Sequence, residues 1–469
     1  MKIPLFFLTI LLFLLPLHGH AALPDSVAQA LKSGGIPEEA VSVYARRVDA
    51  DMPVLAERDE VPRNPASVMK LLTTYAGLEL LGPAYTWRTE IYASEPPRDG
   101  VLNGDLILKG YGDPALTLEK FWSLLHALRL AGVREIRGDL VLDRSYFEAM
   151  AFDPGAFDND PYRPYNAGPD ALLVNFKATG FIFRPEGNNV AIVTDPESPR
   201  LKVVNRLKLR NGACGDWNDQ LGYEVREEGG NLVVSFNGSY AAACAEKRLD
   251  LSLPGHPGYI FQLFSKLWQE QGGMFQGKLR EGSMPPNAVS LVQVSSPPLA
   301  DVIRQINKYS NNLMARQLLM TLGAERGGEP GSPAKGADVI RAWLAANGMA
   351  FPELVVENGA GLSRVERISA RHLGELLMQA YASPYMPELM SSLPIIAVDG
   401  TLKRRTQSSA LAGRAHLKSG SLDDVRAVAG YLLDAKGRRW VVVIMINHPR
   451  ASASKPAQDA LLEWLYRQE

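Results

Sequence analysis

The pattern of apolar residues changes twice along the chain, near Trp87 and near Val289, and these two changes constrain the fold most strongly. Outside them, apolar residues recur at helical spacing, and hairpin patterns lie close to both ends of the chain. Between them, short alternating segments are separated by Gly, Pro, Asn and Asp. The sequence therefore predicts one α/β domain built from both ends, interrupted by a β-rich insertion of about 200 residues.

The two ends supply the helices and strands of the predicted α/β domain. Residues 41–59 predict a hairpin with a polar turn at 49–51. The stretch RNPASVMKLLTTYAGLELLG, Arg63 to Gly82, predicts a largely buried helix that begins near Ser67. Amphipathic helices and then two long strands are predicted within residues 300–323, 337–348, 370–383 and 425–449.

The insertion combines two helix patterns with many short strand patterns. The helices are predicted within residues 112–133 and 257–272. Strands are predicted within residues 89–94, 104–110, 138–144, 180–185, 188–194, 201–211, 231–238 and 248–255.

Length and charge narrow the class of protein. A chain of 469 residues predicts two to three domains. The net charge of −1 provides no general attraction to nucleic acid or to anionic membranes. Nucleic acid is therefore not an expected partner, and we expect a protein that is soluble or loosely associated with the membrane.

The N-terminus has the pattern of a secretory signal peptide. Lys2 precedes an apolar run from Ile3 to Leu17, and small residues follow at Ala21 and Ala22. We expect residues 1–22 to be the signal, cleaved near Ala21 or Ala22. An uncleaved membrane anchor is the alternative, and the shortness of the run and Pro16 argue against it.

Only two cysteines occur, Cys214 and Cys244, and both lie in the exported part. An isolated pair in an oxidising compartment favours a disulfide, with two free thiols as the alternative. Neither cysteine and none of the seven His has metal-ligand spacing, so no metal or cofactor is expected.

Ser67 lies three positions before Lys70 at the start of the buried helix. A Ser hydroxyl needs a neighbour that takes its proton, and a Lys kept neutral by burial or by a nearby cation can do so. The spacing alone is weak, because Ser332–Lys335 and Ser452–Lys455 share it, and a helix cap is an equally ordinary role for Ser.

A nucleophile and base also need groups that relay protons and bind the substrate. Two later motifs supply them, Ser310-Asn311-Asn312 at a helix junction and Lys418-Ser419-Gly420 at the opening of a strand. Lys32-Ser33-Gly34 repeats the third motif but is expected to end a helix. Ser235-Phe236-Asn237 repeats the second but is expected to close a strand at a turn.

The three motifs in this order resemble those of penicillin-binding proteins and serine β-lactamases. The segments PASVMKLLTT, KGYGDPAL, NGAGLSR, LPIIAVDGTL and HLKSGSLDDVRAVAGYL resemble the class C low-molecular-mass penicillin-binding proteins. These are D-alanyl-D-alanine carboxypeptidase/endopeptidases of the penicillin-binding protein four type. The resemblance extends over nearly all of the mature chain.

The resemblance implies a fold and a domain order. The fold is an α/β (α+β) serine β-lactamase/transpeptidase-like sandwich, an antiparallel sheet flanked by helices, with a large β-rich two-part insertion. The implied parts are the signal (1–22), the D,D-peptidase domain (23–85 and 289–469), inserted domain II (86–170 and 256–288) and nested domain III (171–255).

The resemblance also implies roles in the reaction. Ser67 attacks the penultimate D-Ala carbonyl, Lys70 takes its proton, and Ser310 relays a proton to the leaving amine. Asn312 holds the substrate backbone. The oxyanion hole is formed by the backbone N–H groups of Ser67 and Ser421.

The third motif is implied to bind the substrate carboxylate. Lys418 and Ser419 contact it, Gly420 completes the motif, and Lys418 helps to keep Lys70 neutral. Ser419 stands where the family usually has Thr, and Asn358 and Ala360 stand where Asp and Ser are common.

The implied function is that of a periplasmic serine D,D-peptidase. Its partners are peptidoglycan stem peptides, their D-Ala–diaminopimelate crosslinks and β-lactam antibiotics, which acylate the serine covalently. A homodimer is left open. The alternatives are a β-lactamase or esterase on the same scaffold, or a catalytically silent cell-wall binding protein.

Overall fold

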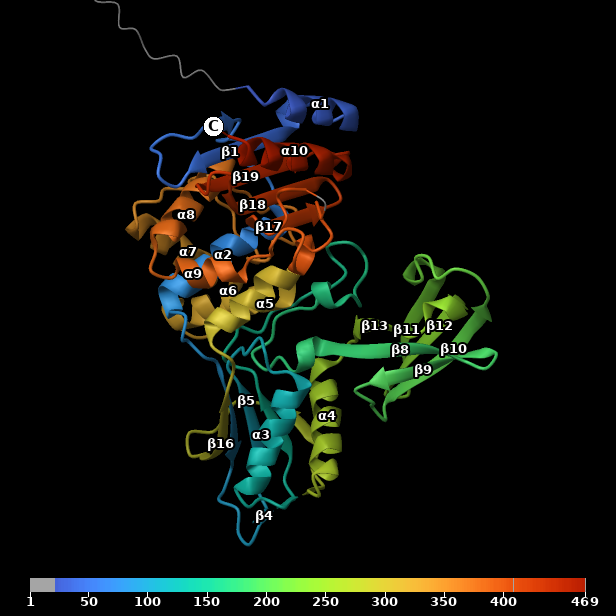
Figure 1. The fold of residues 1–469 in the computed structure, drawn as a ribbon. Helices are drawn as coiled ribbons and strands as arrows, with labels where there is room; N and C mark the ends of the chain where they lie inside the picture. Colours follow the sequence, from blue (N-terminus) through green and yellow to red (C-terminus); the bar gives the residue numbers. More distant parts are fainter. Residues whose placement is uncertain (1–21, 408, 469) are drawn as a thin grey trace, which may run out of the picture.

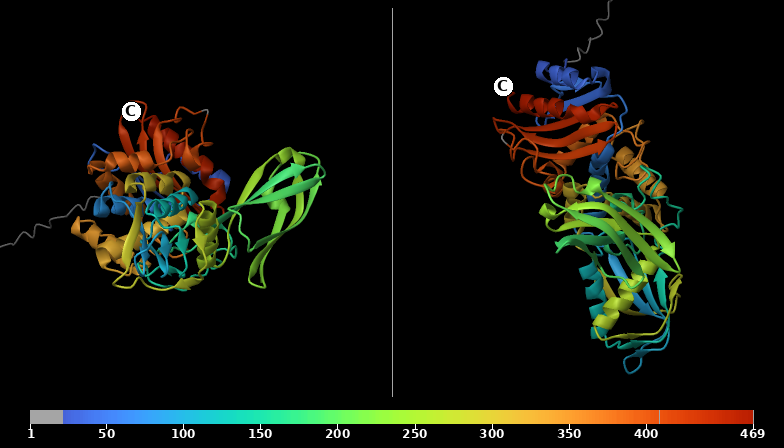
Figure 2. Two further views of the ribbon diagram at one scale, coloured as in Figure 1. Left: turned by 90° about the horizontal axis from the view of Figure 1, so that it is seen from below. Right: turned by 90° about the vertical axis from the view of Figure 1, so that its right-hand side faces the viewer.

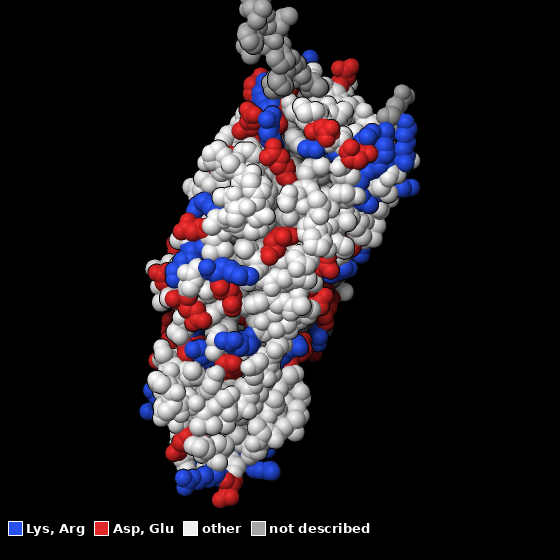
Figure 3. All heavy atoms as spheres, turned by 90° about the vertical axis from the view of Figure 1, so that its left-hand side faces the viewer, with Lys and Arg blue, Asp and Glu red and all other residues white. Residues whose placement is uncertain are grey.

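The computed structural model of the protein describes residues 22–407 and 409–468. The expected signal peptide lies outside the described residues except for Ala22. No helix in the described part of the chain is long and apolar enough to cross a membrane. Lys and Arg side chains mix with Asp and Glu over the face drawn in Figure 3, as the nearly balanced net charge leads one to expect.

The main sheet joins the two ends of the chain, as predicted. It contains β17 (Ala415–Leu422), β18 (Val425–Leu433), β19 (Arg439–Asn447), β1 (Val41–Arg47) and β2 (Leu55–Glu57), in that order. All neighbours are antiparallel, and β1 pairs with β19 from Val41 opposite Ile446 to Arg47 opposite Trp440. Figure 1 shows β1 beside β19, so the α/β class with an antiparallel sheet is confirmed.

Helices cover both faces of this sheet because its central strands are apolar on both sides. In β19, Val441, Val443 and Met445 enter one core, whereas the alternate residues Val442, Ile444 and Ile446 enter the other. The second core is closed by α1 (Asp25–Gly34) and α10 (Lys455–Tyr466). The first contains α2 (Lys70–Leu81), α5 (Leu299–Tyr309), α6 (Asn312–Gly327), α7 (Pro333–Ala346), α8 (Ala370–Ala382) and α9 (Met386–Ser392).

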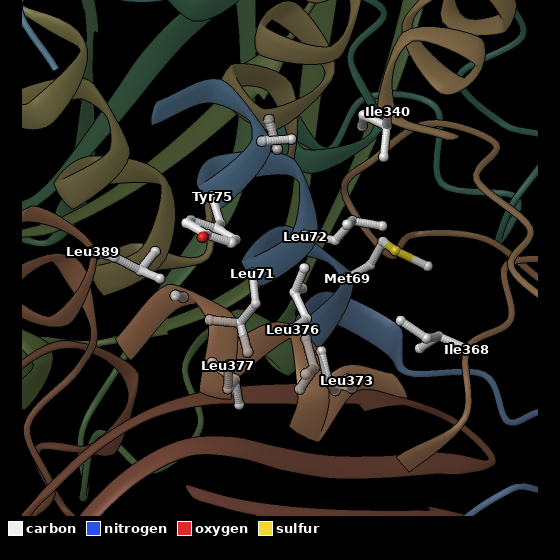
Figure 4. Packing of buried hydrophobic residues seen from close by; sticks show 14 of the residues in the cluster. Met69, Leu71, Leu72, Tyr75, Ile340, Ile368, Leu373, Leu376, Leu377 and Leu389 are labelled. Atoms are coloured by element: carbon white, nitrogen blue, oxygen red, sulfur yellow. The ribbon is translucent and has the colours of Figure 1, made fainter. Parts of the chain in front are cut away.

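Helix α2 lies at the centre of the first core. Every residue from Lys70 to Leu78 is buried, which explains its nearly uniform apolar sequence. Figure 4 shows Leu71, Leu72 and Tyr75 of α2 among side chains of α8, with Ile340 of α7 and Leu389 of α9 nearby. A helix held on all sides fixes the position of the residues at its first turn.

The insertion, together with the strand that follows it in the sequence, forms a second five-stranded sheet. Its order is β15 (Leu279–Glu281), β7 (Leu140–Asp143), β5 (Leu106–Gly110), β3 (Arg88–Ala93) and β16 (Val289–Ser295), the last of which lies just beyond the expected end of the insertion. Helices α3 (Leu118–Leu130) and α4 (His256–Glu270) pack on it through one apolar core. Beside them is a small sheet of β14 (Met274–Phe275), β6 (Glu135–Ile136) and β4 (Val101–Leu102).

A separate lobe projects sideways from the rest of the molecule (Figures 1 and 2). Its two sheets are β13 (Lys247–Ser252), β8 (Ala178–Glu186) and β9 (Asn189–Asp195), then β10 (Leu201–Arg210), β12 (Asn231–Ala241) and β11 (Leu221–Glu228). They enclose an aromatic core, and the predicted Cys214–Cys244 disulfide is present. Ser235–Asn237 lies inside β12, so the expected turn there is wrong.

Candidate active site

Ser67 and Lys70 lie at the junction of two helical segments. A 3₁₀ turn, η2 (Ala66–Met69), leads directly into α2. The Nζ atom of Lys70 lies 3.0 Å from Oγ of Ser67 and 2.6 Å from Oδ1 of Asn312, and it also donates to the carbonyl of Ala360. A base within hydrogen-bond reach of a hydroxyl is the geometry that proton abstraction needs.

The second motif occupies the junction between α5 and α6. Ser310 ends α5 in a left-handed conformation, with φ of 59°. Asn311 caps α6 by accepting a hydrogen bond from the N–H of Met314 at 3.0 Å. This turn directs Ser310 toward Lys418, whose Nζ donates to Oγ of Ser310 at 2.9 Å, while Asn312 contacts Lys70.

The third motif lies in β17, which is an edge strand of the main sheet within the described part of the chain. The strand begins at Ala415, so Lys418 lies at its middle rather than at its opening as predicted. Gly420 permits a close approach to Ser67: a Cβ atom at position 420 would lie 2.6 Å from the carbonyl oxygen of Pro65 and 3.1 Å from the backbone nitrogen of Ser67.

The edge of β17 is covered only at its start. Ile396 donates to Ala415 at 3.0 Å, and Leu417 donates to Pro394 at 2.9 Å. Since N–H groups alternate between the two sides of a strand, those of Ser419 and Ser421 point to the same side as that of Leu417. They therefore face the open part of the edge, next to Ser67.

Of the other Ser–Lys pairs, one lies at a helix cap, and the other, Ser452 and Lys455, lines a cavity beside the third motif. Ser332 caps α7 by accepting from the N–H of Lys335 at 3.4 Å, and Ser452 lies in the short turn η8 (Ala451–Ser454). Lys32-Ser33-Gly34 ends α1, as expected. Only the pair at Ser67 is brought together with the second and third motifs.

Burial lowers the pKa values of both lysines. Lys70 is fully buried, and desolvation together with the charges of Lys418 and Arg316 holds its pKa well below the ordinary value of a lysine. Burial lowers the pKa of Lys418 to about 7. For Lys70, desolvation is the larger cause, and the charge of Lys418 acts in the same direction.

The sequence did not indicate Glu366, which is also fully buried. Its Oε1 accepts the backbone N–H groups of Glu357 at 3.0 Å and of Asn358 and Gly359 at 2.9 Å each. Burial raises the pKa of Glu366, and its charge acts on Lys70 to raise the pKa of that lysine. In the sequence, Glu366 lies between Val365 and Arg367, and no pattern there distinguishes it from an acidic residue on the surface.

Contacts at Ser419 and between the site and the insertion were also not predicted from the sequence. The hydroxyl of Thr401 lies 3.0 Å from that of Ser419, so it orients the side chain that replaces the usual Thr. The insertion also borders the site: Asn312 Nδ2 lies 3.4 Å from the carbonyl of Tyr165, and Arg316 donates to the carbonyl of Ala167 at 2.7 Å. Among the described residues, no group of His, Cys, Asp and Glu is arranged to hold a metal ion.

A helix-start serine, a buried lysine with a lowered pKa, a Ser-x-Asn turn and a Lys-Ser-Gly edge strand define a serine enzyme that transfers acyl groups. The sequence profile of the D-Ala-D-Ala carboxypeptidase 3 (S13) family matches residues 23–468. The chain belongs to this family and is a serine-type D,D-peptidase, a hydrolase.

Individual relatives agree with this assignment. The D-alanyl-D-alanine carboxypeptidase of Actinomadura sp. strain R39 is 28% identical over 415 residues, 85% of this chain and 76% of the relative. The D-alanyl-D-alanine carboxypeptidase DacB of Haemophilus influenzae is 26% identical over 387 residues, 81% of this chain and 80% of the relative. The crystal structure of penicillin binding protein 4 from Haemophilus influenzae shares the fold, with a TM-score of 0.79, 24% identity and coverage of 94% of this chain and 99% of that one.

Proposed function

We propose that Ser67 is the nucleophile of this D,D-peptidase and that Lys70 is its general base. The observation that carries the proposal is the 3.0 Å hydrogen bond between Ser67 Oγ and an Nζ atom whose charged form is disfavoured by burial. A neutral amine at this distance accepts the hydroxyl proton as Oγ attacks the carbonyl carbon of the substrate.

The oxyanion formed in this attack needs donors that are in place beforehand. The N–H of Ser67 lies beside Gly420, and the N–H of Ser421 faces the open edge of β17. We assign the oxyanion hole to these two N–H groups. Donors that are already in place stabilise the negative charge that develops on the carbonyl oxygen.

Collapse of the intermediate needs a proton for the departing amine. Nζ of Lys418 donates to the hydroxyl of Ser310 at 2.9 Å, so we assign the transfer to this pair: Ser310 gives its proton to the leaving amine and takes one from Lys418. Lys418 and Ser419 hold the carboxylate of the departing residue, and Asn312 holds the acyl side of the substrate. Water then takes the place of the amine and attacks the acyl-serine: Ser310 takes the proton of water and passes one to Lys418, and Lys70 returns the proton that it took to Oγ of Ser67 as the acyl bond breaks.

Peptidoglycan is the substrate that this machinery supports. We include both the release of terminal D-Ala from stem peptides and the cleavage of D-Ala–diaminopimelate crosslinks. A β-lactam acylates the same serine, and a solved structure of the Haemophilus influenzae relative holds a novel β-lactam. The periplasmic location, the cleaved signal, the domain boundaries and the homodimer stay predictions.

Labelled penicillin and a stem pentapeptide test the assignment together. The wild-type protein is expected to retain the label on one serine and to release D-Ala, and Ser67→Ala is expected to do neither. Ser332→Ala, a cap in an identical Ser-x-x-Lys spacing, is the matched control and is expected to behave as wild type. Labelling of Ser67→Ala would overturn the assignment, rapid turnover of the drug would favour a β-lactamase, and labelling without D-Ala release would favour a silent binding protein.

A further inference from the structure

A cavity of about 330 Å³ borders the third motif. Ser419 and Ser421 of β17 form one wall, and Arg426 of β18 lies beside them, since Ser421 and Arg426 are direct partners in the sheet. Residues that directly face each other across antiparallel strands project from the same face of a sheet. The lining also includes Arg404, from the loop before β17, and Lys455 and Gln458 of α10.

The charge of this lining is strongly one-sided. It contains four cations, Arg404, Arg405, Arg426 and Lys455, and no Asp or Glu among the described residues. Arg405 is neutralised by Asp459 at 2.6 Å, whereas the other three have no carboxylate partner within the described part of the chain. The chain as a whole has 50 basic and 51 acidic residues, so the lining differs from its average composition.

Gln458 adds a donor that lacks a partner. It is only 4% exposed, and its Oε1 accepts a hydrogen bond from Arg405 at 3.1 Å. Its Nε2 has no hydrogen-bond partner in residues 22–407 and 409–468. A buried donor without a partner is destabilising, and an acceptor that reaches it would satisfy it. Cations, hydroxyls and an amide donor around one space form a site for an anion.

The cavity is continuous with the proposed carboxylate site, because Ser419 belongs to both. The hydroxyl of Ser419 is oriented by Thr401, which lines the same cavity. A substrate group that occupies the cavity would therefore belong to the leaving-group side of the substrate. It would lie beyond the carboxylate that Lys418 and Ser419 hold.

We propose that this cavity binds the additional carboxylates of the leaving half of a peptide crosslink. The inference rests on the proposed function and deepens it. A departing D-Ala has a single carboxylate, and the third motif already accounts for it. In the departing half of a crosslink, the diaminopimelate carboxylate beside the leaving amine takes the place of the D-Ala carboxylate. That half has, in addition, at least the C-terminal carboxylate of the second stem peptide. The cavity thus favours crosslinks over terminal D-Ala.

Charge-neutral variants of two exposed lining residues test this preference. Arg404→Gln and Lys455→Gln, alone and together, are compared with wild type on two probes, a purified D-Ala–diaminopimelate crosslinked muropeptide dimer and a pentapeptide monomer. We expect kcat/KM for the dimer to fall about tenfold for each lost charge-assisted contact, and kcat/KM for the monomer to change by less than about twofold.

A matched control comes from the neighbouring exposed residue Lys403, which does not line the cavity. Lys403→Gln makes the same change of charge, and we expect kcat/KM for both probes to stay at the wild-type value. Acylation by labelled penicillin reports that each variant is folded and that its serine is active.

The outcomes separate this inference from the function on which it rests. Equal losses on both probes, no loss on either, or a wild-type protein that releases D-Ala but leaves the dimer intact would each overturn the role of the cavity alone. A wild-type protein that is not acylated and cleaves neither probe would overturn both. Increased salt is expected to weaken dimer cleavage more than monomer cleavage in the wild type only.

Discussion

The Nζ atom of Lys70 donates a 2.6 Å hydrogen bond to Oδ1 of Asn312, a residue 242 positions further along the chain. The whole insertion lies between these two residues in the sequence. The main sheet and the core around α2 return the chain to this point, so Lys70, the proposed base, is positioned by a contact across the whole insertion.

Replacement of Lys70 by Arg tests the need for a neutral base. Arginine keeps the positive charge and stays protonated, so it cannot take the proton of Ser67. We expect Lys70→Arg to lower the rate of penicillin acylation by about 10²–10⁴-fold, the usual contribution of a general base. Lys335→Arg, in the Ser-x-x-Lys pair at α7, is the control and is expected to acylate normally.

Burial of Lys418 predicts a pH dependence of stability. The unfolded chain keeps this proton up to a pKa of about 10.4, whereas in the folded chain the pKa is about 7. Between these values the unfolded state binds more protons, so the free energy of unfolding rises with pH by up to about 1.4 kcal/mol per unit. This contribution is lost as the pH falls to 7.

Lys418→Met removes that linkage. We expect the variant to be inactive yet more stable than wild type near pH 7, with a smaller slope of stability against pH between pH 7 and 10. Urea unfolding at several pH values measures both slopes, and parallel slopes would contradict the shifted pKa of Lys418.

Glu366 is expected to tune the base. Its carboxylate raises the pKa of Lys70, opposing desolvation. In Glu366→Gln the amide oxygen still accepts the three backbone N–H groups, but the charge is gone. We expect the acid limb of the pH profile for penicillin acylation to move to lower pH. Glu353→Gln, which removes a carboxylate paired with His372 at 2.7 Å, is the control; an unmoved limb in Glu366→Gln would exclude the tuning.

Gly361 is expected to be indispensable for the position of Ser67. Its φ is +78°, and a Cβ atom there would collide with the carbonyl oxygen of Ala66 and the backbone of Ser67. Gly437 has nearly the same φ, +79°, with open space around it. We expect Gly361→Ala to cost about 1–3 kcal/mol more stability than Gly437→Ala and to slow acylation, whereas Gly437→Ala acylates normally.

Much of the fold was predictable because it depends on local periodicity. The alternation within β10, β12 and β13 and the helical spacing within α2, α5 and α8 are visible in short windows. Strand β11 was not predicted, since Leu221–Glu228 is half exposed and rich in charge. It exists because β12 provides a pairing edge, which is a tertiary contact.

The sequence by itself determined which residue types are available to the reaction, namely three motifs in a fixed order within an α/β chain. The order of the three motifs also favoured Ser67–Lys70 over the two other Ser–Lys spacings, but only the tertiary structure shows the burial of Lys70 and its contacts with Ser67 and Asn312. A lysine becomes a base only where burial and a second cation lower its pKa, and both come from residues far away in the chain. For the same reason Glu366 and the cationic cavity beside Ser419 could not be predicted: their roles arise from desolvation and from contacts between distant segments, which no short window of sequence contains.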